Sequence, residues 1–150
     1  MADTPAAVAG LDFDPVELLE TELKAADRAR RLRAVRGLSA VATACGVEAA
    51  KARVLPVVEA HVSAGGEEDE VHLRIAEVLD FSFVTCLGGG DAAQLLLPVL
   101  EALCRVEETT VRDRACLSLA DILEKLDAGK APKTADRVVK LVSTLADPSG

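Results

Sequence analysis

The sequence predicts an all-α fold, a superhelix of about three and a half stacked helical hairpins. The first observation is composition: half of the 150 residues are hydrophobic, yet there is no Trp or Tyr and only three Phe. The core must therefore be built from Leu, Val and Ala, and Ala and Leu are strong helix formers. The second observation is a pattern that recurs about every forty residues. The third is the placement of helix start and stop signals between the apolar stretches.

The recurring pattern is clearest in three aligned segments. They are DRARRLRAVRGL from Asp27, EDEVHLRIAEVL from Glu68 and ETTVRDRACLSL from Glu108, at steps of 41 and 40 residues. An apolar stretch with a Leu-Pro pair precedes the second and third segments, at positions 55–56 and 97–98. Each unit is therefore expected to contain a first helix, a short turn and a second helix, as is typical of helical solenoids.

The first repeat is assigned to about residues 14–46. Residues 1–12 precede its first helix signal and are expected to form a flexible N-terminal segment. Asp14 is predicted to cap the first helix, with Pro15 at the first helical position. The second helix is expected to cover residues 27–46, because the glycine at its end suits a left-handed C-terminal cap.

The second and third repeats follow the same plan, at about residues 47–89 and 90–128. Each first helix contains a proline in its interior, Pro56 or Pro98. The missing N–H and the clash of the ring with the preceding turn are expected to bend the helix there. The glycines at 88–90 are predicted to end the second repeat.

The last predicted helix, residues 134–147, belongs to a partial fourth repeat and completes an array assigned to residues 13–150. Its apolar stripe includes Val138, Val139 and Leu145. No second helix follows to cover this stripe. Because such arrays bury their stripes by stacking neighbours, we expect the chain to be the start of a longer array.

Charge and composition exclude several classes of function. Seventeen basic and twenty-five acidic side chains give a net charge of −8, which is unsuited to general nucleic-acid binding. No apolar run reaches the roughly 18 residues of a membrane-spanning helix, and the N-terminus shows no signal peptide. The four cysteines contain no Cys-x-x-Cys pair, so we expect reduced, buried thiols in a cytoplasmic or nuclear protein.

The sequence shows no group of residues arranged for catalysis. It contains no Gly-x-Ser-x-Gly elbow and no phosphate-binding Gly-Lys-Ser/Thr loop. His61 and His72 fall in no metal-ligand pattern, and His72 is expected to be a solvated turn residue because it aligns with Arg31 and Arg112. We therefore predict a protein that is not an enzyme and has no catalytic residue, cofactor or metal.

Acidic side chains gather at the predicted turns, in the run Glu67–Glu70 and at Glu107 and Glu108. One acid near a helix N-terminus gains roughly 0.3–1 kcal/mol from the helix dipole. That explains one or two of them, whereas four consecutive acids repel one another. The run is either a solvated turn or part of a docking edge, because all turns of a stacked array lie along one ridge.

Basic side chains gather in the first unit, where residues 24–36 hold six basic groups and one acid. This helix is either an exposed end of the array or a site for an acidic partner. Asp27 with Arg31, and Glu108 with Arg112, are spaced four residues apart. They are predicted to form either local ion pairs or a ladder between units.

The whole pattern resembles HEAT repeats, which are helical hairpins of about forty residues with a bent first helix. More closely, residues 13–147 resemble the N-terminal repeats of the scaffold (A) regulatory subunits of type 2A serine/threonine protein phosphatases. The resemblance rests on LLETELK from Leu18, LRAVRGLSAVA from Leu32, ACGVE from Ala44, VLP from Val54, EDEV from Glu68, LLPVLEAL from Leu96 and VEETTVRDRA from Val106.

This resemblance implies a non-enzymatic scaffold whose repeat turns, with the adjoining second helices, bind exchangeable B-type regulatory subunits. The catalytic subunit is expected to bind only C-terminal repeats that this chain lacks. Nucleic acid and membrane partners are not expected. The second turn, SAGGEEDE, is about three residues longer than in the family. The implied contacts are Asp69, Glu70, Glu107, Glu108, Thr109 and Arg112.

Two other classes also fit helical repeats. One is another HEAT or armadillo adaptor of a transport or coat assembly, which would bind a cargo peptide in its concave groove. The other is a helical-repeat enzyme, such as a lyase or a DNA repair glycosylase. An enzyme of that kind needs an activated carboxylate or thiol near a pocket, and the glycosylase also needs a basic face.

Overall fold

The computed structural model describes residues 14–64, 69–126, 136–141 and 143, and all regular structure in these ranges is helical. The all-α prediction is therefore confirmed. The predicted N-terminal segment 1–12 lies outside the described residues. The elements are α1 (Pro15–Leu23), α2 (Arg28–Arg36), α3 (Leu38–Cys45), α4 (Val47–Ala49), the π-helix η1 (Ala50–Val54), α5 (Leu55–Ser63), α6 (Asp69–Val78), α7 (Phe81–Cys86), the 3-10 helix η2 (Gly90–Leu96), α8 (Leu97–Cys104) and α9 (Thr109–Lys125).

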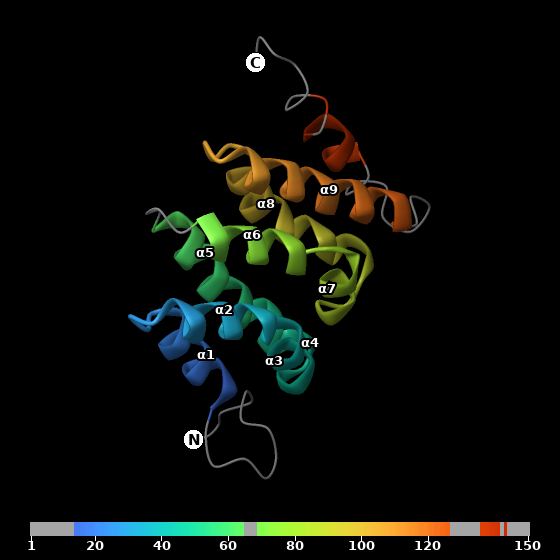
Figure 1. Cartoon of the computed structure of the whole chain (residues 1–150). Coiled ribbons are helices and arrows are strands. Elements are labelled where there is room, and N and C mark those ends of the chain that lie inside the picture. Colours follow the sequence, from blue (N-terminus) through green and yellow to red (C-terminus); the bar gives the residue numbers. More distant parts are fainter. Residues whose placement is uncertain (1–13, 65–68, 127–135, 142, 144–150) are drawn as a thin grey trace.

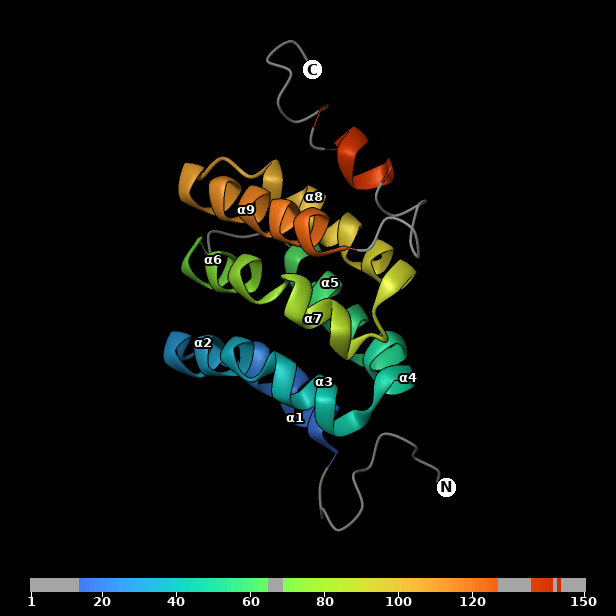
Figure 2. The same ribbon diagram turned by 90° about the vertical axis from the view of Figure 1, so that its right-hand side faces the viewer.

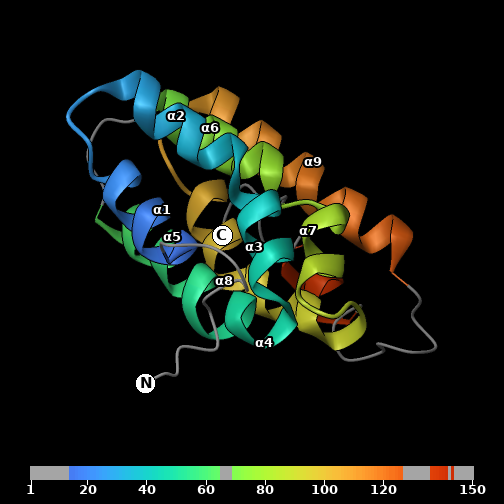
Figure 3. The ribbon, with the colours of Figure 1, turned by 90° about the horizontal axis from the view of Figure 1, so that it is seen from below.

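The elements stack as hairpins in two layers (Figure 1). Helices α2, α6 and α9 follow one another along the stack in one layer (Figure 2). Seen from below, α1, α5 and α8 form the other layer (Figure 3). Each hairpin thus pairs a first helix with a second helix and covers the next hairpin along the chain. This arrangement is the helical-repeat solenoid that the forty-residue period predicts.

The core consists of the aliphatic residues that the composition predicts. Leu38, Leu79 and Leu119 occupy the same place in the three aligned segments, and all three are fully buried. Burying a leucine side chain contributes roughly 1.5–3 kcal/mol, so each hairpin gains an equivalent contribution at this position. Among the residues that the structure describes, Phe83 is the largest fully buried side chain.

The predicted start and stop signals are present at the helix ends. Asp14 caps α1, its carboxylate accepting a hydrogen bond from Val16 N–H at 2.9 Å, and Asp27 caps α2 in the same way. Gly88 and Gly89 end the second hairpin with φ angles of 103° and 73°. Because side chains other than glycine rarely adopt this left-handed region, the two glycines are required there.

Both interior prolines follow a change of helix type. The π-helix η1 leads directly into α5, where Pro56 is the second residue, and the 3-10 helix η2 leads into α8 and Pro98. Such changes shift the hydrogen-bond pattern at the place where proline has no N–H to donate. The sequence located these interruptions but did not predict that one would be wider and the other tighter than an α-helix.

The second helices differ from the prediction in being broken in two of the three hairpins. The predicted helix 27–46 breaks at Gly37, which separates α2 from α3, whereas α9 runs unbroken for 17 residues. In the second hairpin, Asp80 separates α6 from α7, because its carboxylate caps α7 by accepting from Ser82 N–H at 3.0 Å. A capping aspartate and a weak helix former therefore override the apolar periodicity.

The unbroken α9 compensates for the break in α6. Asp80 N–H donates to Val78 O at 2.9 Å, so the carbonyl of Ala76 lacks its usual helical donor. The hydroxyl of Ser118, which is fully buried on α9, donates to that carbonyl at 2.5 Å. On the other side of the break, Asp121 accepts from Phe81 N–H at 3.1 Å. The third hairpin therefore satisfies the backbone groups that the second leaves open.

The predicted helix 134–147 is described at residues 136–141 and 143, all of them helical. Val138 is fully buried and Val139 is exposed, while Leu145 lies outside the described residues. Within the described residues, the stripe is thus buried at Val138, which joins the hydrophobic core, and open at Val139. None of the helices in the described part of the chain is long and apolar enough to span a membrane.

Candidate functional site: a ridge of repeat turns

The turns of the three hairpins lie along one edge of the stack, on the left of Figure 1, where α2, α6 and α9 begin. We call this edge the turn ridge and define it by Arg28, Asp69, Glu70, Glu107, Glu108 and Thr109. An ion pair joins its first and second turns, since Arg28 Nη1 lies 3.7 Å from Glu70 Oε1. The structure therefore places the predicted contact residues on the same side of the molecule.

The third turn is held together by Arg112. Its Nη1 donates to the carbonyl oxygens of Val106, at 3.2 Å, and Glu107, at 3.1 Å, and its Nη2 donates to Thr109 Oγ1 at 3.1 Å. The Glu108 carboxylate caps α9 by accepting from Thr110 N–H at 3.2 Å. Among the described residues no ion pair joins Glu108 to Arg112, so the local pair predicted there is wrong. Arg112 therefore orders the turn through these three hydrogen bonds.

The first turn uses the same device. Arg31, which aligns with Arg112, donates through Nη1 to Ala25 O at 2.6 Å and to Ala26 O at 2.8 Å. Charged donors of this kind stabilise the last carbonyls of a helix and the turn after it. The arginine at the fifth residue of the first and third aligned segments could have signalled this role, because the turn lies just before it in both.

The second turn holds His72 at the equivalent position. Only 5% of His72 is exposed, and its ring centroid lies 6.3 Å from that of His61 in an edge-on arrangement. The expectation of a solvated His72 is therefore wrong. The imidazole packs against His61, whereas the longer side chains of Arg31 and Arg112 reach the carbonyls of their turns. Glu67 and Glu68 lie outside the described residues.

The exposed carboxylates of the turn ridge differ in whether they also have a structural role that limits their contact with a partner. Asp69 and Glu70 open α6, and both are exposed. Glu107 is exposed in the third turn, where only its backbone carbonyl takes part in the bonding to Arg112. Glu108 is exposed but engaged as a cap. Glu107 thus presents its side chain without a structural duty in the turn.

The basic helix of the first unit is partly neutralised from within. Arg30 forms a two-point contact with Glu22 on α1, with Nε to Oε1 at 3.1 Å and Nη2 to Oε2. The hydrogen bond from Arg30 lowers the pKa of Glu22 below its ordinary value. Arg33 and Arg36 remain exposed at the surface. Most of the basic cluster therefore serves the hairpin itself and the neighbouring turn.

A half-buried ion pair joins the first hairpin to the second. Arg53 Nη2 lies 2.5 Å from Asp14 Oδ2, and both side chains are less than one-third exposed. Burial of Asp14 opposes its ionisation, but hydrogen bonds from Arg53 and from Val16 N–H outweigh this and lower its pKa. The pair thus ties the cap of α1 to the π-helix η1.

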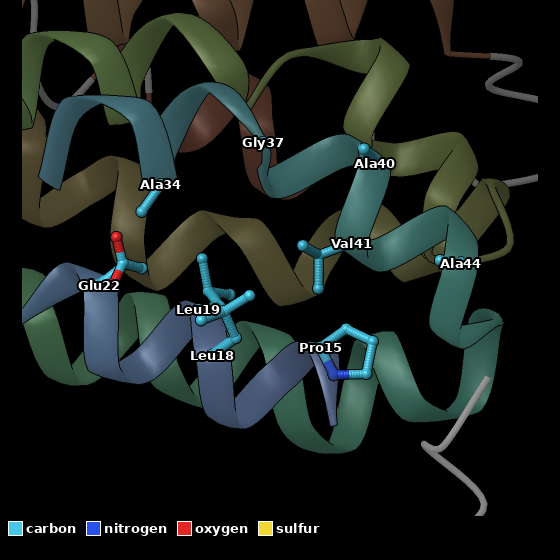
Figure 4. A pocket seen from close by; sticks show the side chains of 9 residues that line it. All are labelled: Pro15, Leu18, Leu19, Glu22, Ala34, Gly37, Ala40, Val41 and Ala44. Atoms are coloured by element: carbon cyan, nitrogen blue, oxygen red, sulfur yellow. The ribbon is translucent and has the colours of Figure 1, made fainter. Parts of the chain in front are cut away.

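An apolar hollow lies on the first hairpin between α1 and the α2–α3 segment (Figure 4). Its volume is about 330 Å³, and Leu18, Leu19 and Val41 point toward it, with Glu22 at one end as its single ionisable residue. A lining of this kind offers no nucleophile paired with a base. Within the described residues no cluster of three or more His, Cys, Asp or Glu could hold a metal ion.

The four cysteines are free thiols with different exposure. Cys104 is buried, Cys45 and Cys86 are half-buried, and Cys116 is exposed. The expectation of buried cysteines is therefore wrong for Cys116, which lies on the outer surface of α9. Burial raises the pKa of the Cys45 thiol, so it is not an activated nucleophile.

Comparisons with known proteins point to one kind of relative. The chain is 40% identical over 126 residues to the beta isoform of the 65 kDa regulatory A subunit of serine/threonine-protein phosphatase 2A from Rattus norvegicus, covering 81% of this chain and 20% of that protein. It is 38% identical over 132 residues to the alpha isoform from Arabidopsis thaliana, covering 88% of this chain and 21% of the relative. The regulatory A subunit of protein phosphatase PP2A from Saccharomyces cerevisiae is 40% identical over 112 residues, which cover 75% of this chain and 17% of the relative.

These relatives are regulatory subunits of a phosphatase and not transport adaptors or helical-repeat enzymes, so neither alternative class gains support. The chain spans about a fifth of the length of the relatives it matches. No protein family model matches it.

Proposed function

Because the chain belongs to the family of 65 kDa regulatory A subunits of protein phosphatase 2A, we propose that it is a non-enzymatic scaffold that docks B-type regulatory subunits through its turn ridge. The catalytic subunit would bind repeats outside this chain. The observation that supports the proposal best is the alignment of the three turns on one edge, with exposed carboxylates at the second and third.

The ridge has the properties of a preformed binding edge. Arg112 holds the third turn through three hydrogen bonds, so little ordering is needed when a partner binds. The Arg28–Glu70 pair sets the first turn against the second. Asp69 and Glu107 place exposed negative charge on this edge, and the chain as a whole has a net charge of −8. The matching surface of the regulatory subunit should therefore be basic, and its association should weaken as salt rises.

The test is direct binding of a purified B-type regulatory subunit to the full chain and to its Glu107→Lys variant. Glu107 bonds to Arg112 only through its backbone, so the variant should keep the turn and its thermal stability. We expect about tenfold weaker binding and a smaller salt dependence, because reversing a rim charge removes an attraction and adds a repulsion.

The matched control is Glu48→Lys, on α4 at the opposite edge of the stack (Figure 1). Both variants replace a glutamate with lysine, so they change the net charge equally. The Glu48 side chain is 92% exposed, so its replacement should not disturb the fold. Equal weakening by both would mean that overall charge, and not the ridge, drives binding. Unchanged binding by both would move the contact away from the third turn. No binding by the unmodified chain would contradict the proposed function.

A further inference from the structure

Two cysteines of the third hairpin contact each other. Cys104 is the last residue of α8 and Cys116 lies in the middle of α9, and their Sγ atoms are 3.8 Å apart. Cys86 lies elsewhere, with its Sγ 3.5 Å from Thr43 Oγ1. The third hairpin therefore holds a thiol pair that neither the fold nor the proposed docking function uses.

We propose that Cys104 and Cys116 are a modification site, at which hydrogen peroxide converts the two thiols into an intramolecular disulfide. The proposal is independent of the docking function. The geometry is close to what the bond needs: a disulfide has an S–S length of about 2.05 Å, so the sulfurs must approach by roughly 1.8 Å. Rotation of the two side chains can supply this movement, because α8 and α9 already pack against each other.

The exposure of the two thiols assigns their roles. Cys116 is exposed and can meet peroxide in solution, whereas Cys104 is buried behind it. Burial, reinforced by the neighbouring Cys116, raises the pKa of Cys104 to about 12, so this thiol stays protonated at neutral pH. Cys116 is therefore the thiol that peroxide reaches first, and Cys104, whose sulfur lies 3.8 Å away, resolves the product.

The chemistry proceeds in two balanced steps. The Cys116 sulfur attacks one peroxide oxygen, an S–O bond forms, the O–O bond breaks, and the leaving hydroxide takes up the thiol proton as water. The Cys104 sulfur then attacks the Cys116 sulfenic acid. An S–S bond forms, the S–O bond breaks, and a second water leaves with the Cys104 proton. Two thiols lose two electrons, and one peroxide is reduced to two waters.

The access of peroxide to Cys116 follows from its place in the repeat. Val35 and Ala76 occupy the equivalent positions in the first two units, and both are fully buried. Cys116 is not covered in this way by the described residues. Of the three aligned residues, Cys116 is thus the one that the described structure leaves open to peroxide.

The disulfide would join α8 to α9 just behind the third turn. Cys104 precedes Arg105–Glu108, and Cys116 lies two helical turns into α9. A disulfide there closes a loop in the unfolded chain and lowers its conformational entropy. The melting temperature of the oxidised form should therefore be higher by roughly 5 °C or more.

The test treats the purified full chain with hydrogen peroxide, blocks the remaining thiols with an alkylating reagent and maps the peptides by mass spectrometry. We expect a mass loss of two hydrogens, one linked peptide pair joining Cys104 to Cys116, and alkylated Cys45 and Cys86. A thiol reductant should reverse both the linkage and the gain in melting temperature.

The control variants distinguish a disulfide that the folded structure favours from unspecific oxidation of the cysteines. Cys86→Ser should react like the unmodified chain, while Cys116→Ser should form no linkage. Since Cys116 is exposed, its variant should still fold, whereas Cys104→Ser tests the resolving role if it folds as well. Oxidation in denaturant should spread the linkages over all four cysteines. The proposal is overturned if the folded chain stops at a Cys116 sulfenic acid, or if the Cys104–Cys116 link forms no faster than other pairs.

Discussion

Replacing Ser118 with Ala should destabilise the chain, even though Ser118 lies outside the turn ridge. Its hydroxyl is fully buried and donates to the Ala76 carbonyl, which the break before Asp80 leaves without a helical donor. Removing the hydroxyl leaves a buried acceptor unsatisfied, at a cost of about 1–3 kcal/mol. Because 1 kcal/mol lowers the melting temperature of a domain of this size by about 2–4 °C, we expect a fall of roughly 2–12 °C.

The assay is thermal unfolding followed by circular dichroism, together with amide hydrogen exchange. The matched control is Ser63→Ala at the end of α5, where the side chain is exposed, and it should shift the melting temperature by less than about 2 °C. Exchange in Ser118→Ala should rise most around the break between α6 and α7. A variant as stable as the unmodified chain would refute the idea that α9 satisfies the broken helix.

Three further predictions concern single positions. Arg112→Ala should lower stability by about 1–3 kcal/mol in urea unfolding and should weaken regulatory-subunit binding through a looser third turn, whereas an effect on binding alone would mean direct contact. Gly88→Ala should destabilise the chain by about 1–3 kcal/mol, because φ is 103° and the new Cβ would lie 3.3 Å from Val47 Cγ1. Gly37→Ala should stabilise it by about 0.5–1 kcal/mol, because φ is −88° and the atom nearest to the new Cβ is 3.6 Å away. Equal melting temperatures of the two variants would contradict this contrast. The lowered pKa of Asp14 contributes stability that is full above about pH 4 and is lost as pH falls through that pKa, so Asp14→Asn, which keeps the cap acceptor, should flatten the acid limb of a stability–pH curve.

Much of the fold could be predicted, because the information is local and repeated. The period of about forty residues located the hairpins, and the caps at Asp14 and Asp27 follow from short side chains placed before apolar stretches. Leu38, Leu79 and Leu119 align and are all buried. Each of these features depends on residues within one unit, so a single sequence is enough to find them.

The features that were missed depend on contacts between elements. The burial of His72 could not be predicted from its alignment with two arginines, because a short imidazole and a long guanidinium can take different directions from the same backbone position. The break at Asp80 had a local signal, a capping aspartate before Phe-Ser-Phe, but the apolar period concealed it. That α9 would supply Ser118 to the broken helix depends on the packing of two units.

The candidate site divides in the same way. The acidic turns and their common edge follow from the period, so Asp69 and Glu107 could be assigned to a ridge from sequence. The sequence could not show that Arg112 faces the turn carbonyls, or that Glu108 serves as a cap, because both roles depend on how the turn closes. Of the six predicted contacts, those with free side chains are therefore better candidates for binding than those that build the turn.

The ridge is a property of the stack and not of any one turn. Its shape depends on how each hairpin is held against the next. Arg28 pairs with Glu70 at the turn end of the first interface, while Arg53 pairs with Asp14 from the other layer. At the second interface Ser118 donates to the Ala76 carbonyl of α6, near the end of that helix that lies away from the turns. Since these contacts set the tilt between hairpins, loosening one of them should misplace turns that remain intact. Binding of a partner that spans two turns would then fall although no contact residue has changed, and binding of a partner that touches one turn would not.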